Sequence, residues 1–184
     1  MNQKLIAVAL FCYTYAFCTP PAAAEGYKDF KFEGNTIHAF VPTGWSALTG
    51  VVNIPLTFLT EKGNQDTRGA ISVIPFDETS EKDGFANLKK DPENYYDQKE
   101  KTLHASGGES ISYIPFQEQK KDGAKIYSIG IRYHLGEADI LDKTYYITSK
   151  NNHAFMVKVL MPSDLEKENE VAINKEVETI SARN

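Results

Sequence analysis

Alternation of side chains with a period of two along residues 124–135 is the feature that most constrains how this chain folds. Tyr127 and Ile129 lie on one side of this run, whereas Ser128 and Arg132 lie on the other. Successive side chains of an extended strand point to opposite faces, so the pattern predicts a half-buried β-strand. The sheet that contains this strand must be covered by another layer on at least one face.

Two further strand-like runs follow it closely. Residues 140–148 are rich in β-branched and aromatic side chains, and residues 155–161 are apolar on both faces. Apolar side chains on both faces are typical of a central strand that is covered on both sides. The connectors at 136–139 and 150–152 have turn chemistry. The three runs are therefore predicted to form an antiparallel meander.

Strands are also predicted earlier in the chain, over residues 36–41, 55–60, 69–76 and 110–118. One octapeptide occurs twice in similar form, as Ile71–Glu78 and Ile111–Glu118. A true repeat would have matching flanks, and these flanks differ. We interpret the two copies as similar strands that each end in a proline, which lacks the amide donor of a strand ladder. Both prolines are therefore expected at a sheet edge or at a strand end.

Two helices are predicted from their end signals. Asp91 is suited to an N-cap, Pro92 to the first helical position, and the glycine at 107 to the end of the helix. Its inner face is predicted to carry Tyr96, Lys99 and Leu103. A short turn at 85–88 is expected before it.

The second helix follows Pro162. Ser163 and Glu166 have the spacing of a capping box, which predicts that the helix begins there. Four apolar residues then recur at helical spacing: Leu165, Ile173, Val177 and Ile180. This face is predicted to pack on the sheet, with the helix continuing to near residue 184.

Residues 1–24 have the layout of a cleaved secretory signal peptide. Lys4 precedes an apolar run over residues 5–18, and small residues at 22–24 form a cleavage site before Glu25. The apolar run is too short for a transmembrane helix, which needs about 20 residues. Cys18 follows a bulky phenylalanine, which argues against a lipoprotein. The protein is therefore expected in the periplasm or secreted, without a transmembrane anchor.

Residues 25–184 have the length of a single domain. Cleavage removes Cys12 and Cys18, so this domain contains no cysteine and can form neither a disulfide nor a thiolate zinc site. Of 20 Lys and Arg residues, loss of Lys4 leaves 19, against 25 Asp and Glu. This acidic balance without a basic block argues against nucleic acid as a partner. No cofactor is predicted.

The segment Phe40-Val41-Pro42-Thr43-Gly44-Trp45, together with the order of predicted elements over residues 27–182, resembles the PsbP-like superfamily. That superfamily includes photosystem extrinsic subunits, the Ran-binding Mog proteins and the DcrB type. The resemblance implies an α+β fold, an α/β/α sandwich around a twisted, mainly antiparallel sheet. It implies an accessory or binding role and no shared catalytic residue. Trp45 would be a structural anchor.

A hairpin end offers the best cluster of metal-ligand residue types. His134, Glu137, Asp139 and Asp142 could supply a nitrogen and several carboxylates. The loop is short, however, and mixed polar turns of this kind are ordinary. We therefore interpret the hairpin end as a solvated turn, predict no metal, and retain His134, Glu137 and Asp139 as the weak alternative.

Two pairs of adjacent tyrosines, at 95–96 and 145–146, contain candidate binding residues. Adjacent residues in a helix or strand face different ways, so one ring of each pair is expected in the core and the other toward the surface. A surface tyrosine buries a large area at low entropic cost. The candidate binding residues are Trp45, Tyr96, Arg132, His134 and Tyr146.

The serines lie outside any G-x-S-x-G context, and the histidines lack a ligand partner two or four residues away. The sequence therefore predicts a non-enzymatic exported binding or accessory protein whose partner is another envelope protein. A small-molecule or lipid carrier with a pocket between sheet and helix is the first alternative. An unrecognised hydrolase is the second. The oligomeric state stays open.

Overall fold

A computed structural model describes residues 25–32, 35–51, 54–63, 67–76 and 88–184. The predicted signal peptide and most of the predicted turn at 85–88 lie outside these residues. The strands are β1 (Gly26–Phe32), β2 (Asn35–Val41), β3 (Ser46–Val51), β4 (Ile54–Lys62), β5 (Arg68–Phe76), β6 (Glu109–Lys121), β7 (Ala124–Leu135), β8 (Ala138–Thr148) and β9 (Ala154–Pro162). The helices are α3 (Pro92–Ala105) and α4 (Ser163–Arg183).

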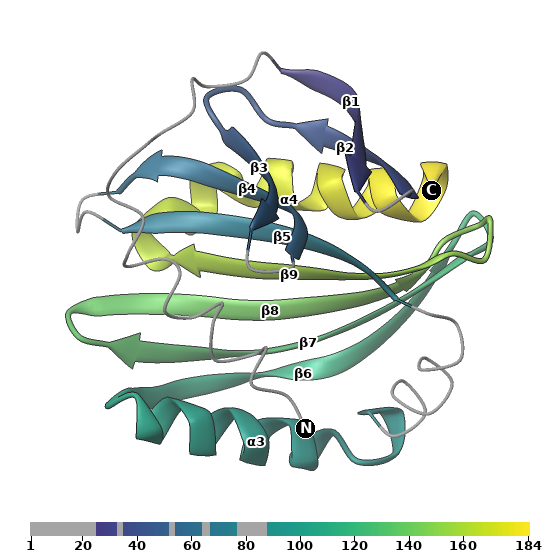
Figure 1. Ribbon diagram of the computed structural model, residues 1–184. Coiled ribbons are helices and arrows are strands. Elements are labelled where there is room, and N and C mark those ends of the chain that lie inside the picture. The colour runs from purple at the N-terminus through teal and green to yellow at the C-terminus, as the bar shows by residue number, and fades with distance from the viewer. Residues whose placement is uncertain (1–24, 33–34, 52–53, 64–66, 77–87) are drawn as a thin grey trace.

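The strands form two sheets. A two-stranded sheet contains β1 and β2, and a seven-stranded sheet has the order β3-β4-β5-β9-β8-β7-β6. All neighbouring strands pair antiparallel. The predicted meander is confirmed as β7, β8 and β9, with β6 before it. As predicted, β9 is a central strand with both faces largely buried. Figure 1 shows α3 along the β6 side of the sheet and α4 beside β1 and β2.

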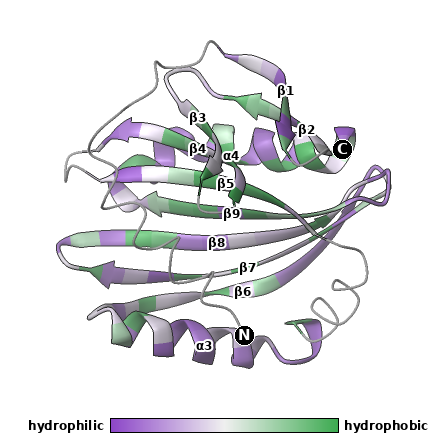
Figure 2. Cartoon of the chain, in the orientation of Figure 1, coloured by the Kyte–Doolittle hydropathy of each residue, from purple (hydrophilic) through white to green (hydrophobic). Residues whose placement is uncertain are grey.

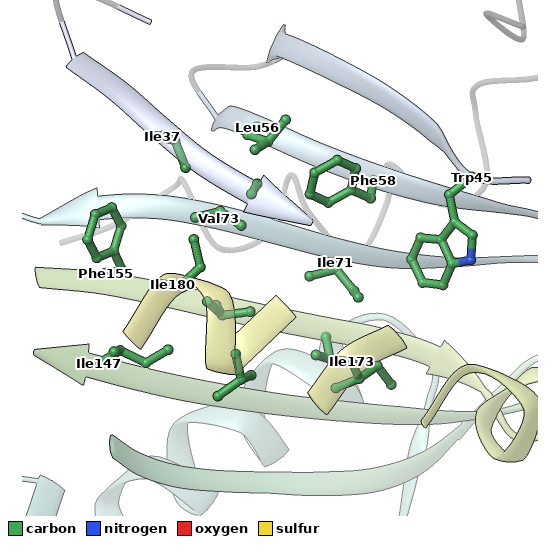
Figure 3. Close-up of a cluster of buried hydrophobic side chains, with 14 of the residues drawn as sticks. Ile37, Trp45, Leu56, Phe58, Ile71, Val73, Ile147, Phe155, Ile173 and Ile180 are labelled. Carbon is green, nitrogen blue, oxygen red and sulfur yellow. The ribbon is translucent and has the colours of Figure 1, made fainter. Parts of the chain in front are cut away.

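One face of the large sheet packs against α4 and is apolar. Phe58, Ile71 and Val159 occupy one cross-strand row on β4, β5 and β9, and all three are fully buried. Ile173 and Val177 of α4 belong to the same buried cluster. Figure 3 shows the isoleucine side chains of α4 among those of the sheet. The apolar face that was predicted for the second helix is therefore confirmed.

The β1–β2 hairpin attaches to α4 through one edge of β2. The Asn184 side chain accepts a hydrogen bond from the His38 amide at 2.7 Å and donates one to the His38 carbonyl at 2.8 Å. Two residues further on, the Phe40 amide donates to Glu176 Oε2 at 2.8 Å. Side chains of α4 and of its C-cap residue Asn184 thus take the place that a neighbouring strand would occupy, which satisfies backbone groups that would otherwise be unpaired.

The other face of the large sheet is different in chemistry. A buried cross-strand row over β4, β5, β9 and β8 is polar throughout, and it consists of Thr57, Ser72, Lys158 and Thr144. Helix α3 lies on this side and contacts β6 and β7. Its inner face carries Tyr96, Lys99 and Leu103, as predicted. Figure 2 shows that α3 is largely hydrophilic.

The ends of the two helices differ in how well they follow the sequence signals. Asp91 caps α3 by accepting a hydrogen bond from the Asn94 amide at 3.2 Å, as predicted. The predicted capping box of α4 is wrong, because Pro162 occupies the N-cap position and no side chain caps it. Strand β9 runs directly into α4, so Ser163 is already helical and cannot act as the cap. In the described part of the chain, neither helix is long and apolar enough to cross a membrane.

Strands β1 and β3 were not predicted from the sequence. Strand β1 carries three charged residues among seven, and β3 has six residues and contains Gly50 at φ +68°. Charges in β1 and Gly50 in β3 interrupt the apolar pattern, and each segment forms a strand by pairing with its neighbour. The two octapeptides behave as expected. Pro75 lies one residue before the end of β5, and Pro115 lies in the edge strand β6.

Candidate functional site

Strand β6 forms one edge of the seven-stranded sheet and is exposed along almost its whole length. Two of its large apolar side chains are open to solvent, since Ile111 is 46% exposed and Tyr113 is 50% exposed. They lie two residues apart, and the ring of Tyr113 stacks on Tyr96 of α3. We call the surface formed by β6 and the adjoining side of α3 the β6–α3 surface. It contains the most prominent exposed tyrosine on the large sheet within the described residues.

Breaks in the ladder between β6 and β7 shape this surface. Ser110 lies opposite Tyr133 and Ser112 lies opposite Arg132, so Ile111 is the extra residue of a β-bulge. A second irregularity lies between Ile114 and Gln117 and includes Pro115. Bulges bend an edge strand and interrupt its pairing.

The exposed Tyr113 is held in place by α3. Its ring stacks on the ring of Tyr96, with centroids 4.5 Å apart and planes inclined by 29°. Its hydroxyl donates a hydrogen bond to Glu100 Oε1 at 2.7 Å. The hydroxyl of Tyr96 in turn donates to the Ile114 carbonyl at 2.8 Å, which ties α3 to β6. Tyr113 is therefore both exposed and conformationally fixed.

The pKa values of Glu100 and Tyr113 are consistent with the hydrogen bond between them. Hydrogen bonds from Ser110 and Tyr113 hold the pKa of Glu100 below its ordinary value. The same contact with Glu100 is the main cause that raises the pKa of Tyr113. At neutral pH the pair is thus a carboxylate and a neutral phenol. This is the protonation state in which the hydroxyl donates and the carboxylate accepts.

A buried ion cluster lies between α3 and the sheet. Lys99 Nζ is 2.6 Å from Asp142 Oδ2, and Lys158 Nζ is 3.6 Å from the same oxygen. Asp142 is 5% exposed and Lys158 is 4% exposed. Burial alone would raise the pKa of Asp142, but the charges of Lys158 and Lys99 outweigh it and hold that pKa below its ordinary value. The cluster connects α3 to β8 and β9.

Two tyrosines border this cluster. The Tyr95 ring lies 5.4 Å from Lys99 Nζ, and its hydroxyl is 3.5 Å from the Thr144 hydroxyl. Burial is the main cause that raises the pKa of both Tyr95 and Tyr146. Both phenols therefore stay neutral at physiological pH.

The structure does not gather the five candidate binding residues into one site. Trp45 lies in the core on the α4 side, as Figure 3 shows. Arg132 also faces α4, where it pairs with Glu166 through two hydrogen bonds of 2.5 and 2.7 Å. Tyr146 packs with Tyr96 in the cluster on the opposite side. Of the five, only Tyr96 contributes to the β6–α3 surface.

The residues of the weak metal alternative are also separated. His134 of β7 pairs with Asp139, which lies opposite it on β8. Glu137 lies in the turn between these strands. Asp142 points to the other face of the sheet, toward Lys99 and Lys158. Among the described residues, no group of three His, Cys, Asp or Glu side chains is arranged to hold a metal ion.

Sequence reasoning missed Ile111 and Tyr113, although it predicted the strand that carries them. The available signal was Pro115, which marked this strand as one of two candidates for an edge. The partner of Tyr113, Tyr96, was identified from its place in a tyrosine pair. What the sequence could not show is that Tyr96 and Tyr113 meet, because their contact joins a helix to a strand.

Comparison with known proteins supports the architecture. No protein-family model matches the chain. No curated protein matches it. The solution structure of cyanobacterial PsbP (CyanoP) from Synechocystis sp. PCC 6803 is similar, with a TM-score of 0.50 and 12% sequence identity over 85% of this chain and 92% of that chain. At this identity the likeness shows the fold alone. The chain has a PsbP-like α+β fold, as its element order predicted.

Proposed function

We propose that this chain is an exported, non-enzymatic accessory protein that binds another envelope protein through the β6–α3 surface. The observation that carries the proposal is the state of Tyr113, which is half exposed yet held by stacking on Tyr96 and by a hydrogen bond to Glu100. A tyrosine that is already ordered loses little conformational freedom when a partner covers it. Residues of this type supply much of the binding energy at protein interfaces.

Features of β6 indicate that the partner contacts side chains rather than extending the sheet. The strand contains two irregularities and Pro115, and it ends in Lys120 and Lys121. Bulges, prolines and lysines are the features by which natural edge strands avoid pairing with other chains. Docking through Ile111 and Tyr113 does not require main-chain pairing.

The proposed export depends on the leader pattern of residues 1–24 and agrees with the absence of cysteine from residues 25–184. We expect the protein purified from the envelope fraction to begin at Glu25, which intact-mass measurement of the native protein checks. A mass that retains the leader would contradict this part of the proposal.

Site-specific photocrosslinking in native cells tests the docking surface. Tyr113→p-benzoylphenylalanine places a reactive group on the β6–α3 surface. Val171→p-benzoylphenylalanine is the matched control, because Val171 is 74% exposed on α4, which packs on the opposite face of the sheet. We expect one discrete protein adduct at position 113 and none at position 171.

A second variant tests whether the same side chain contributes binding energy. Tyr113→Ser is expected to reduce retention of the crosslinked partner about tenfold, in line with loss of an interface hot spot. Circular dichroism checks that the variant is folded. Equal adducts at positions 113 and 171, or no adduct at position 113, would overturn the proposed function.

A further inference from the structure

Acidic side chains line the β6–α3 surface. Glu93, Asp97 and Glu100 are spaced by four and then three residues, so they share one side of α3. That side faces the exposed tyrosine, since Glu100 accepts its hydrogen bond. The negative charge of Asp97 is a further, smaller cause that raises the pKa of Tyr113, after the Glu100 hydrogen bond, burial and the Glu100 charge.

The negative charges of α3 also act on Tyr96, whose ring adjoins that of Tyr113. Burial is the first cause that raises the pKa of Tyr96, and the charge of Glu93 adds to it. Glu109, at the start of β6, is exposed but lies opposite His134 of β7. The exposed Tyr113 is thus bordered by three acidic side chains of α3.

The basic residues of α3 compensate this charge only in part. Lys99 is turned inward onto Asp142 and is not available at the surface. His104 lies 3.3 Å from Glu100 and is charged only when protonated. Lys101 is exposed, but it follows Glu100 by one residue and therefore lies about 100° further around the helix.

We infer that the partner presents a basic amphipathic segment, in which Lys or Arg side chains flank an apolar residue that packs on Tyr113 and Ile111. This inference rests on the proposed function and names the chemistry of the partner. Opposite charges around an apolar contact increase the association rate and exclude acidic competitors. An anionic lipid surface would be repelled by the same carboxylates.

Titration with synthetic peptides tests the charge requirement. Three peptides of equal length share the same Leu and Trp positions and carry Lys, Gln or Glu at all other positions. Fluorescence anisotropy with the intact exported chain measures their binding. We expect the Lys peptide to bind about tenfold more tightly than the Gln peptide, and the Glu peptide to bind more weakly than either. The preference should decrease as salt increases.

Two double variants test whether the preference for the Lys peptide arises from the acidic side chains of the β6–α3 surface. Glu93→Gln combined with Asp97→Asn removes two charges from the β6–α3 surface and should bring Lys-peptide binding down to the level of the Gln peptide. Glu168→Gln combined with Glu170→Gln removes two exposed charges from α4 and should leave binding unchanged. Glu100 is kept, because it orders Tyr113.

Three outcomes overturn the inference: equal binding of the Lys and Glu peptides, no binding of the Lys peptide, or equal weakening by the two paired variants. These outcomes are distinct from failure of the proposed function, which the photocrosslinking experiment measures without peptides. A crosslinked partner whose contact segment is acidic would overturn the inference and leave the proposed function standing.

Discussion

The two faces of the seven-stranded sheet differ in the polar groups that they bury. On the α4 side, Phe58, Ile71 and Val159 form an apolar row that packs on the helix. On the α3 side, the same three strands bury Thr57, Ser72 and Lys158. The first face derives its stability from the removal of apolar surface from water. The second also buries an apolar cluster that includes Leu103, Ile131 and Leu160. Its polar row depends in addition on specific partners, because an unpaired buried charge is costly.

Two buried carboxyl groups show this difference most clearly. Glu176 on α4 is 1% exposed, accepts a hydrogen bond from the Phe40 amide, and has no cation beside it among the described residues. Burial raises its pKa to about 8. Asp142 is buried to a similar degree, but Lys158 and Lys99 lower its pKa. The α4 side therefore keeps its acid neutral, whereas the α3 side keeps its acid charged and paired.

The largest expected effect is the loss of core volume on the α4 side. Phe58→Ala should reduce the free energy of unfolding by roughly 4–5 kcal/mol, at the upper end for such changes because the side chain is fully buried. Urea denaturation measures it. Leu59→Ala is the control, since Leu59 is half-buried and packs in the cluster on the α3 side. If the two variants lost equal stability, the apolar face would not dominate the core.

An effect of similar size is expected at Glu176, but it appears only at high pH. The folded pKa lies above the ordinary value of 4.5, so stability should fall as pH rises from about 4.5 through about 8. Glu176→Gln cannot ionise and should be nearly neutral at low pH. Well above pH 8 it should be more stable than the wild type by roughly 4–5 kcal/mol. Thermal unfolding across this pH range checks the divergence.

The control for this pH dependence is Glu178→Gln, because Glu178 lies on the same helix but forms an exposed ion pair with Lys121. Its pH profile should match that of the wild type. A Glu176→Gln variant that kept the wild-type slope would show that Glu176 is ionised in the folded protein, which would remove the contrast between the two faces.

The smallest of the three effects is expected on the α3 side. Asp142→Asn leaves the buried ammonium groups of Lys99 and Lys158 without their shared carboxylate and should cost about 3 kcal/mol near neutral pH. The folded pKa of Asp142 is below 3.8, so its contribution is present above that pH and is lost as pH falls through the folded pKa. The variant should lack this acid-induced loss.

Asp139→Asn is the matched control for that substitution, since Asp139 lies on the same strand with a half-exposed side chain that pairs with His134. Its unfolding free energy should stay close to that of the wild type. Equal losses in the two variants would show that the buried cluster is no more important than a surface pair.

Much of the fold was predictable because the signals are local. Strand β7 begins at Ala124 and ends at Leu135, as the alternation predicted, and Asp91 caps α3 as its chemistry predicted. Strands β1 and β3 were not predicted, because charges in β1 and Gly50 in β3 interrupt the apolar pattern, and pairing with neighbours determines their conformation. Element order, together with the segment Phe40–Trp45, indicated the PsbP-like architecture.

The candidate site was less predictable. Asp142 and Lys158 were visible as charged residues within apolar strands, but only the register of β8 against β9 shows that they meet. Lys99 reaches them because α3 crosses this face of the sheet. Tyr96 was a candidate from the sequence, whereas Tyr113 was not, since its exposure depends on β6 being an edge.

The sequence by itself determined the period-two strands, the two helices with their inner faces, and the absence of cysteine from residues 25–184. These properties depend on side-chain alternation, capping and composition, which act within a few residues along the chain. Only the tertiary structure decided which strand lies at the edge, which buried acid has cations beside it, and which tyrosine is exposed. Those outcomes depend on contacts between segments far apart in the sequence, where register and packing determine whether a charge or a ring has a partner.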